Sequence, residues 1–265
     1  MKTYVSAALI ALIAVVFTSQ PAQGQEEMRK IKNEAFKRGE LLTYRLHYGI
    51  IDAGKATISI ENEDKIIDGH DTYHIIGLGN STGAFNFFFK VRDRYETYMD
   101  ADALCPLIFI RRVDEGGFKF GQDMVFDQKY HKVNSSGKEY TIPEYIQDMI
   151  SGFYYARTLD YSHMEPGHID SVVTFIDNEV WNLKIKFVRR DTIKSDVGKI
   201  SCMVFEPIVQ KGRIFRNEED LQVWISDDKN HIPVRADASI LVGSIKMDLE
   251  SYSGLANDLA LVKKK

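Results

Sequence analysis

The stretch Leu41-Leu42-Thr43-Tyr44-Arg45-Leu46-His47-Tyr48 indicates the fold class of this chain. Large apolar or aromatic side chains occupy its even positions, and polar side chains alternate with them. Successive side chains of a strand point to opposite faces of a sheet, so this period of two predicts a strand with one buried face. The alternation resumes over residues 56–60, and the intervening Asp52-Ala53-Gly54 predicts a turn that closes a hairpin.

The same rhythm continues along the chain. Short alternating or apolar runs are separated by turn residues such as Asp68-Gly69, Gly116-Gly117 and Asp177-Asn178. Further strands are predicted over residues 72–78, 91–99, 107–113, 118–127, 171–176, 180–189, 200–209, 221–226, 232–238 and 239–251. This spacing predicts an all-β, mainly antiparallel fold, either a sandwich or an open barrel, rather than βαβ units.

One segment has the pattern of a helix instead. Thr141 is placed to cap it, Pro143 falls just inside its start, and Glu144 completes a capping box. The apolar residues that follow at helical spacing are Ile146, Met149, Ile150, Phe153 and Tyr154. They predict one amphipathic helix over residues 143–157, docked on the sheet. Two sheets divided near this helix are an alternative to one continuous sheet.

The N-terminus has the features of a signal peptide. Lys2 precedes an apolar run of about 14 residues, shorter than the roughly 20 that span a bilayer. Ala22 and Gly24 then supply the small residues of a cleavage site. We expect residues 1–24 to be removed and residues 25–265 to form a single β-rich domain. The mature protein is expected to be exported, periplasmic and soluble, without a stable membrane span.

Charge and cysteine content narrow the possible partners. The formal net charge is −4 and the pI is about 6.0, which argues against nucleic acid, because binding phosphates needs a basic stripe. Cys105 and Cys202 both sit among apolar residues and form no framework pattern. Two buried free thiols are expected, and one disulfide is the alternative.

The polar motifs do not identify an activity, so the catalytic residues remain unknown. Ser81 lies in Gly79-Asn80-Ser81-Thr82-Gly83, which differs from a nucleophile elbow and predicts a flexible loop. His70 and His74 would lie about 13 Å apart on a strand. Together with Asp68 and Asp71 they predict a polar turn rather than a metal site. We therefore expect neither a metal nor another cofactor.

An aromatic cluster is the most suggestive segment. Phe85, Phe87, Phe88 and Phe89 follow a glycine-rich stretch. If exposed, these rings would mark a surface for a partner, lipid or other ligand. Phenylalanine is usually interior, so burial is the expectation. The predicted ligand-binding residues are these four together with Arg94 and Trp224.

Several stretches resemble a family of exported envelope proteins known as domain of unknown function 3108. They are Gly39-Glu40 with Tyr44, residues 48–56, Asp93-Arg94-Tyr95-Glu96-Thr97-Tyr98, Glu115-Gly116-Gly117, Asp148-Met149, Tyr154-Tyr155-Ala156-Arg157, Val223-Trp224-Ile225-Ser226-Asp227-Asp228 and Ile232-Pro233-Val234. The resemblance covers nearly the whole mature chain. It implies an all-β protein exported by Gram-negative bacteria, with a fold similar to envelope lipoproteins of capsule-secretion systems. It transfers no catalytic residue.

A looser likeness concerns residues 224–235, where a Trp-bearing strand, a polar turn and a Pro-Val-Arg strand look like a strand pair of periplasmic lipoprotein carriers. Those carriers are half-barrels that hold acyl chains. The preferred hypothesis is a non-enzymatic binding or assembly module for a lipid, glycan or envelope protein. The alternatives are a hydrolase acting on an envelope polymer, which needs a cleft with convergent titratable groups, and a structural or scaffold protein.

Overall fold

The computed structural model describes residues 28–49, 51–83, 85–208, 221–239 and 244–263. The signal peptide predicted for residues 1–24 lies outside these ranges. The helices are α1 (Phe85–Phe88) and α2 (Met149–Ala156). The strands are β1 (Leu41–Tyr48), β2 (Ile51–Ile60), β3 (Lys65–Ile67), β4 (His70–Ser81), β5 (Arg92–Asp100), β6 (Pro106–Glu115), β7 (Phe118–Asp127), β8 (Lys132–Ser135), β9 (Lys138–Thr141), β10 (Ile169–Ile176), β11 (Glu179–Ser195), β12 (Gly198–Ile208), β13 (Leu221–Ser226), β14 (Pro233–Ser239) and β15 (Ser244–Ser253).

These strands form one antiparallel sheet. Its order is β10-β11-β12-β13-β14-β15-β1-β2-β4-β5-β6-β7-β8-β9, and β3 pairs with β4 at one side. The first strand, β1, pairs with the last strand, β15, in the middle of the strand order. The predicted all-β antiparallel fold is confirmed. The strands before and after α2 belong to the same sheet, which excludes two sheets divided at the helix.

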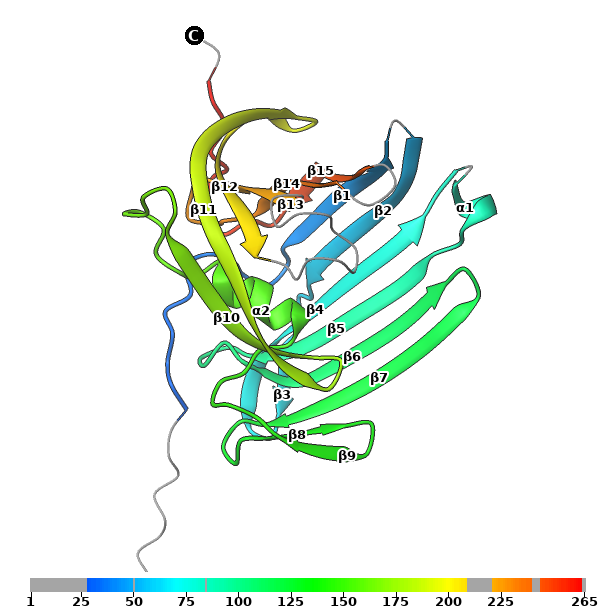
Figure 1. Ribbon diagram of the computed structural model, residues 1–265. Coiled ribbons are helices and arrows are strands. Elements are labelled where there is room, and N and C mark those ends of the chain that lie inside the picture. Colours follow the sequence, from blue (N-terminus) through cyan, green and yellow to red (C-terminus); the bar gives the residue numbers. More distant parts are fainter. Residues whose placement is uncertain (1–27, 50, 84, 209–220, 240–243, 264–265) are drawn as a thin grey trace, which may run out of the picture.

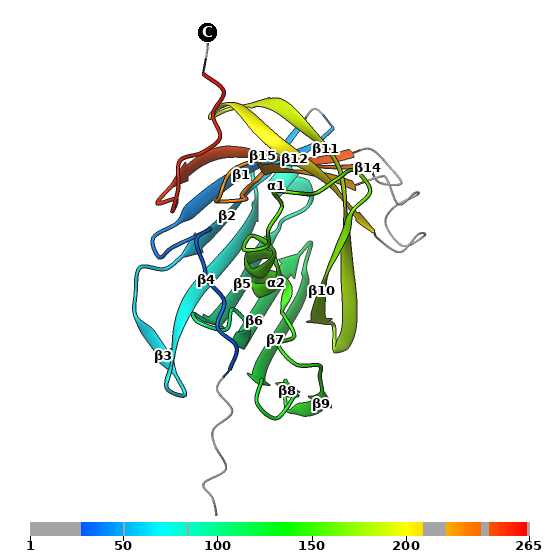
Figure 2. The ribbon, with the colours of Figure 1, turned by 90° about the vertical axis from the view of Figure 1, so that its left-hand side faces the viewer.

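The sheet curves strongly but does not close within the described strands, because β9 and β10 end it without pairing with each other. Figure 1 shows α2 in the hollow of this open barrel, and Figure 2 shows the same helix between β10 and the β4–β6 region. Side chains link the β10–β11 turn to β6 and β7. Arg111 donates to Asp177 at 2.7 Å, and Gln122 donates to Asn178 at 3.1 Å. None of the described helices is long and apolar enough to cross a bilayer.

The first hairpin turns earlier than the sequence predicts. Gly49 adopts a positive φ of 59° at the turn, whereas Gly54 lies inside β2. A Cβ on Gly54 would lie 2.5 Å from the carbonyl oxygen of Asn80 on β4. The prediction of a turn at residues 52–54 is therefore wrong, because Gly54 permits a close approach of strands rather than a bend.

The helix also begins later than predicted. Residues 143–148 precede α2, and the capping box is formed by Asp148 and Ser151 instead of Thr141 and Glu144. Gln147 runs beside β10, where its N–H donates to the Val173 carbonyl and its own carbonyl accepts from the Phe175 N–H. The chain is thus held extended at Gln147, and only α2 itself, Met149–Ala156, confirms the prediction of a docked helix.

A small hydrophobic cluster, which includes Phe187 and Phe205, accompanies two large ones in the interior. One large cluster lies between α2 and the strands β2 to β10, and it contains Ile75, Met99, Phe109 and Tyr154. The other large cluster joins β1 and β11–β15 to the C-terminal segment. Cys105 and Cys202 are buried free thiols, so the disulfide alternative is not realised.

Candidate functional site

An apolar groove of about 240 Å³ lies between α2 and the concave face of β10–β13. Eleven of its fifteen lining residues are apolar, counting glycine and proline. They are Met149, Gly152, Phe153, Ala156, Val172, Leu183, Ile185, Phe205, Pro207, Val223 and Ile225. The four polar lining residues are Arg157, Tyr161, Thr174 and His231. A concave, mostly apolar site with a few placed polar groups is the usual form of a small-molecule site.

The helical wall of the groove follows from helix periodicity. Met149, Gly152, Phe153 and Ala156 are spaced i, i+3, i+4 and i+7, so they share one face of α2. Gly152 lets this face approach β10, since a Cβ there would lie only 3.4 Å from Thr174 Cγ2. The Asp148 carboxylate fixes the start of the helix by accepting from the N–H groups of Ile150 and Ser151 at 2.7 and 2.8 Å.

The sheet wall follows from strand periodicity. Alternate residues of each strand line the groove, as Val223 and Ile225 of β13 do. The intervening Trp224 packs into the buried cluster on the opposite face. The same alternation applies to β12, where Phe205 lines the groove and Val204 belongs to that opposite cluster.

Arg157 lies at the C-terminal end of α2, beside the groove. Its guanidinium makes two hydrogen bonds to the Glu40 carboxylate, at 2.6 and 2.8 Å, and both side chains are almost completely buried. It also donates to the carbonyl oxygens of Asn230 and Ala35, at 2.8 and 3.2 Å. This charged group is therefore neutralised and saturated by the protein itself.

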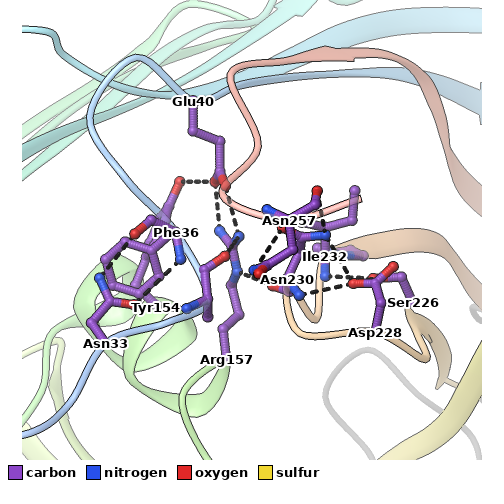
Figure 3. A network of polar contacts seen from close by, with 12 residues as sticks. Asn33, Phe36, Glu40, Tyr154, Arg157, Ser226, Asp228, Asn230, Ile232 and Asn257 are labelled. Carbon is purple, nitrogen blue, oxygen red and sulfur yellow. Dashed lines mark hydrogen bonds and ion pairs between the residues drawn. The ribbon is translucent and has the colours of Figure 1, made fainter. Parts of the chain in front are cut away.

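The network continues from Arg157 to the C-terminal segment, as Figure 3 shows. The Asp228 carboxylate accepts from the backbone and side-chain N–H groups of Asn230, at 2.8 and 3.0 Å. Asn230 in turn accepts from the Asn257 N–H at 2.8 Å. These contacts join the start of β1, the end of α2 and the turn before β14 beneath one end of the groove.

The other polar groups of the groove are similarly engaged. The Tyr161 hydroxyl donates to the Ala156 carbonyl at 2.7 Å. His231 Nδ1 lies 2.7 Å from the Arg157 carbonyl, which can only accept, so this nitrogen carries the proton. Burial is the main cause that lowers the pKa of His231, and it favours the neutral ring. Apolar contact is therefore the main interaction that this lining offers.

The predicted aromatic residues lie elsewhere, on α1 and directly after it. Phe87 and Phe88 are 87% and 82% exposed, and Phe89 is also exposed, so the expectation of burial is wrong. Phe85 contacts Tyr48, with ring centroids 6.2 Å apart, and Phe89 covers Gly116. Phe85 at the start of α1 and Phe89 just after its end thus fix the helix to two neighbouring hairpins, and Phe87 and Phe88 remain in solvent.

The other predicted binding residues are not gathered at α1. Arg94 on β5 donates to Glu96 at 2.6 Å. Trp224 is largely buried, and its Nε1 donates to Asp191 at 3.1 Å. In the sheet, β14, β15, β1 and β2 separate β13 from β4, the strand that leads into α1. The six predicted residues therefore do not form one site.

The polar segments are ordered parts of the sheet. Ser81 is the last residue of β4, and its hydroxyl is buried and donates to Asn86 at 2.8 Å, so the predicted flexible loop is wrong. His70 pairs with Asp100, while His74 lies between Glu63 and Glu96. Within the described ranges, no group of three His, Cys, Asp or Glu side chains is arranged to hold a metal ion.

Sequence reasoning missed the groove, although one signal was present. The run Cys202-Met203-Val204-Phe205 is apolar at both odd and even positions. A strand of this kind is covered on both faces, and a continuous apolar run is its usual sign. In β12 one covered face is the core, and the other includes Phe205 at the groove.

Comparison with known families decides the classification. The family model described as protein of unknown function (DUF3108) matches residues 43–250. The chain belongs to this family. The match spans β1 to β15 and therefore includes both walls of the groove as well as α1.

A solved structure of low sequence identity has a similar fold. A β-barrel-like protein of domain of unknown function DUF1849 from Brucella abortus aligns with a TM-score of 0.52 and 9% identity, over 83% of this chain and 99% of that one. A DUF1089 family protein from Pseudomonas aeruginosa aligns with a TM-score of 0.37 and 10% identity, over 68% and 87% of the two chains. A comparison with curated proteins finds no match. The Brucella structure supports the DUF3108 protein's barrel-like fold.

Proposed function

We propose that this DUF3108 protein is an exported, periplasmic, non-enzymatic binding module of the cell envelope. It holds an apolar part of an envelope molecule, such as the acyl chain of a lipid, in the groove between α2 and β10–β13. The observation that carries this proposal is the apolar lining of that groove. The signal peptide predicted for residues 1–24 supports the periplasmic part of this proposal.

The rim of the groove supports an apolar ligand. Met149 and Leu183 line it and remain 41% and 44% exposed. Each side chain leaves apolar surface in water, and a bound acyl chain would cover that surface. Burial of apolar surface is favourable by roughly 25 cal/mol per Å². A ligand that covers both walls gains this favourable free energy of burial.

The state of the polar groups favours a lipid over a glycan. Glycan recognition uses hydrogen-bonding groups that are free to meet sugar hydroxyls. Arg157 is already bound to Glu40, and the Tyr161 hydroxyl to the Ala156 carbonyl. The same engagement argues against the hydrolase alternative, which requires titratable groups converging on a substrate.

Displacement of a fluorescent fatty acid tests the proposal. cis-Parinaric acid is expected to bind the mature chain with enhanced fluorescence, and phospholipid is expected to compete with it. Val223→Asp places a charge on the groove wall, and we expect it to weaken binding at least tenfold, because an uncompensated charge opposes burial of the probe. Ile66→Asp is the matched control, because Ile66 is an exposed apolar residue of β3.

Circular dichroism and a melting curve show whether each variant remains folded. Equal binding of the probe by the wild type, Val223→Asp and Ile66→Asp would contradict the groove as the site. Loss of binding in both variants would likewise contradict it, because the effect would then not depend on the groove.

A further inference from the structure

The short helix α1 presents two phenylalanines outward from one end of the sheet. Phe87 and Phe88 pack against each other edge to face, with ring centroids 5.4 Å apart. Figure 1 shows α1 at the end of the molecule where the β1–β2 and β6–β7 hairpins also terminate. Ile51 and Phe118, at the ends of those hairpins, are 52% and 63% exposed. We name Ile51, Phe87, Phe88 and Phe118 the aromatic tip.

Contacts on both sides hold the phenylalanine pair of the aromatic tip in place. Phe85 contacts Tyr48 of β1, and Phe89 covers Gly116 in the β6–β7 turn, where the Gly116 N–H donates to the Lys90 carbonyl. The Ser81 hydroxyl joins Asn86 to the end of β4, and it accepts from the Val91 N–H at 2.8 Å. Residues on both sides of the exposed pair are thus fixed, so Phe87 and Phe88 are held in water rather than folded back.

Basic side chains lie on one side of this apolar tip. Lys90 follows Phe89 directly. A surface hollow of about 390 Å³ beside it is lined by Arg92, Arg112 and Lys119, together with one acidic residue, Asp114. The Arg92 guanidinium donates to the Ser81 carbonyl, which places the hollow next to α1.

Within the described residues, two of these four cations have a carboxylate partner and two do not. Arg112 pairs with Asp123 at 2.6 Å, and Lys119 with Asp114 at 3.5 Å. In the part of the chain that the structure describes, no acidic side chain pairs with Lys90 or Arg92. Apolar rings that protrude beside unpaired cations are the arrangement found in proteins that lie on anionic lipid surfaces.

We propose that the aromatic tip docks this protein on the surface of an anionic phospholipid membrane. Phe87 and Phe88 enter the boundary between headgroups and acyl chains, and Lys90 with the basic hollow meets the lipid phosphates. The surface contact is reversible and leaves the sheet outside the hydrocarbon. This proposal does not rest on the groove, which is lined by other elements.

Flotation of the mature chain with vesicles tests the proposal. One set of vesicles contains phosphatidylcholine alone, and the other contains phosphatidylcholine and phosphatidylglycerol in equal parts. We expect the chain to float with the anionic vesicles, more weakly with the neutral ones, and less as salt is added. The double variant Phe87→Ser with Phe88→Ser should weaken binding by about a hundredfold, or about tenfold for each ring.

Further variants test whether binding depends on the charge of Lys90 and on the location of the exposed rings. Lys90→Glu should weaken binding to anionic vesicles several-fold and leave binding to neutral vesicles unchanged. The control is Ile66→Ser with Tyr130→Ser, which removes two large side chains outside the tip that are 69% and 64% exposed, and it should float like the wild type. The groove variant Val223→Asp should also float normally, which separates this proposal from the proposed function.

A spectroscopic readout covers the case in which the double variant is unstable. In Phe88→Trp, the added fluorescence should shift to the blue with anionic vesicles, and brominated lipid should quench it. Flotation of the folded double variant at the wild-type level would overturn the proposal. So would an unshifted Phe88→Trp spectrum, or a wild-type dimer that the double variant dissociates, since a second copy would then cover the tip.

Discussion

The carboxylate of Glu40 accepts two hydrogen bonds from the guanidinium of Arg157, a residue 117 positions further along the chain. Glu40 precedes the first strand, and Arg157 ends the helix that forms one wall of the groove. A planar carboxylate and a planar guanidinium that meet in this way fix both distance and orientation. The pair therefore ties the position of α2 to the central strands of the sheet.

Removing one member of this pair is expected to destabilise the fold. Glu40→Gln leaves the Arg157 charge buried without a counter-charge, and Arg157→Met does the same to Glu40. We expect each single variant to lower the free energy of unfolding by about 3–5 kcal/mol. The double variant Glu40→Gln with Arg157→Met should lose less than the sum of the two. Urea unfolding measures all three, and additive losses, or single losses under about 1 kcal/mol, would contradict this role.

Asp148 is expected to make stability fall as the pH rises. Burial raises the pKa of its carboxyl from 3.8 to about 6, despite hydrogen bonds from Thr97, Ser151 and Ile150. The folded protein thus holds a proton that the unfolded chain releases, so this contribution is complete below about pH 4 and is lost as the pH rises through about 6. The loss amounts to about 3 kcal/mol.

The Asp148→Asn variant checks this prediction, because asparagine also caps helices but does not titrate. The free energy of unfolding of the wild type, minus that of Asp148→Asn, should be larger at acid pH than at neutral pH. Unfolding free energies of both proteins across this range give the difference directly. A difference that is constant, or that changes in favour of the wild type at higher pH, would be inconsistent with a raised pKa.

The two cysteines are expected to be unreactive in the folded protein. Burial raises the pKa of both the Cys105 and the Cys202 thiol to about 12, so the reactive thiolate is scarce at neutral pH. Ellman's reagent should label neither thiol of the native chain within minutes, and both after unfolding in urea. Rapid labelling of the native protein, or a disulfide between Cys105 and Cys202 that leaves no thiol to label after unfolding, would show that this description is wrong.

Much of the fold could be predicted because strand burial follows a simple period. Leu42 and Tyr44 are buried, as the alternation in residues 41–48 predicts, and β1 has the predicted bounds. The Asp68-Gly69 turn was also predictable, since both residues adopt the positive φ that this dipeptide favours.

The wrong predictions concern local sequence patterns that are compatible with two different structures. Gly54 was assigned to a turn, but it is needed where β2 and β4 approach closely. Thr141 and Glu144 have the spacing of a capping box, yet backbone bonds between Gln147 and β10 delay the helix until Met149. Phe87 and Phe88 are exposed because Phe85 and Phe89 take the anchoring positions of α1, a division that composition alone does not reveal.

The groove was beyond sequence reasoning for a different reason. Its walls come from α2 and four strands, and they meet only because the whole sheet curls around the helix. Apolar residues such as Phe205 and Ile225 look like ordinary core positions in the sequence. The curvature of the sheet around α2 decides which of them line the groove.

Native mass spectrometry of the mature chain, from Gln25 onward, tests the central claim most directly. The protein is recovered gently from a bacterial periplasm and measured before and after denaturation, beside Val223→Asp and Ile66→Asp. We predict an additional mass on the wild type and on Ile66→Asp that disappears on denaturation, fragments as a lipid, and is reduced or absent on Val223→Asp. A clean apo mass on all three proteins, or an adduct that fragments as a glycan, would contradict the groove as a lipid site.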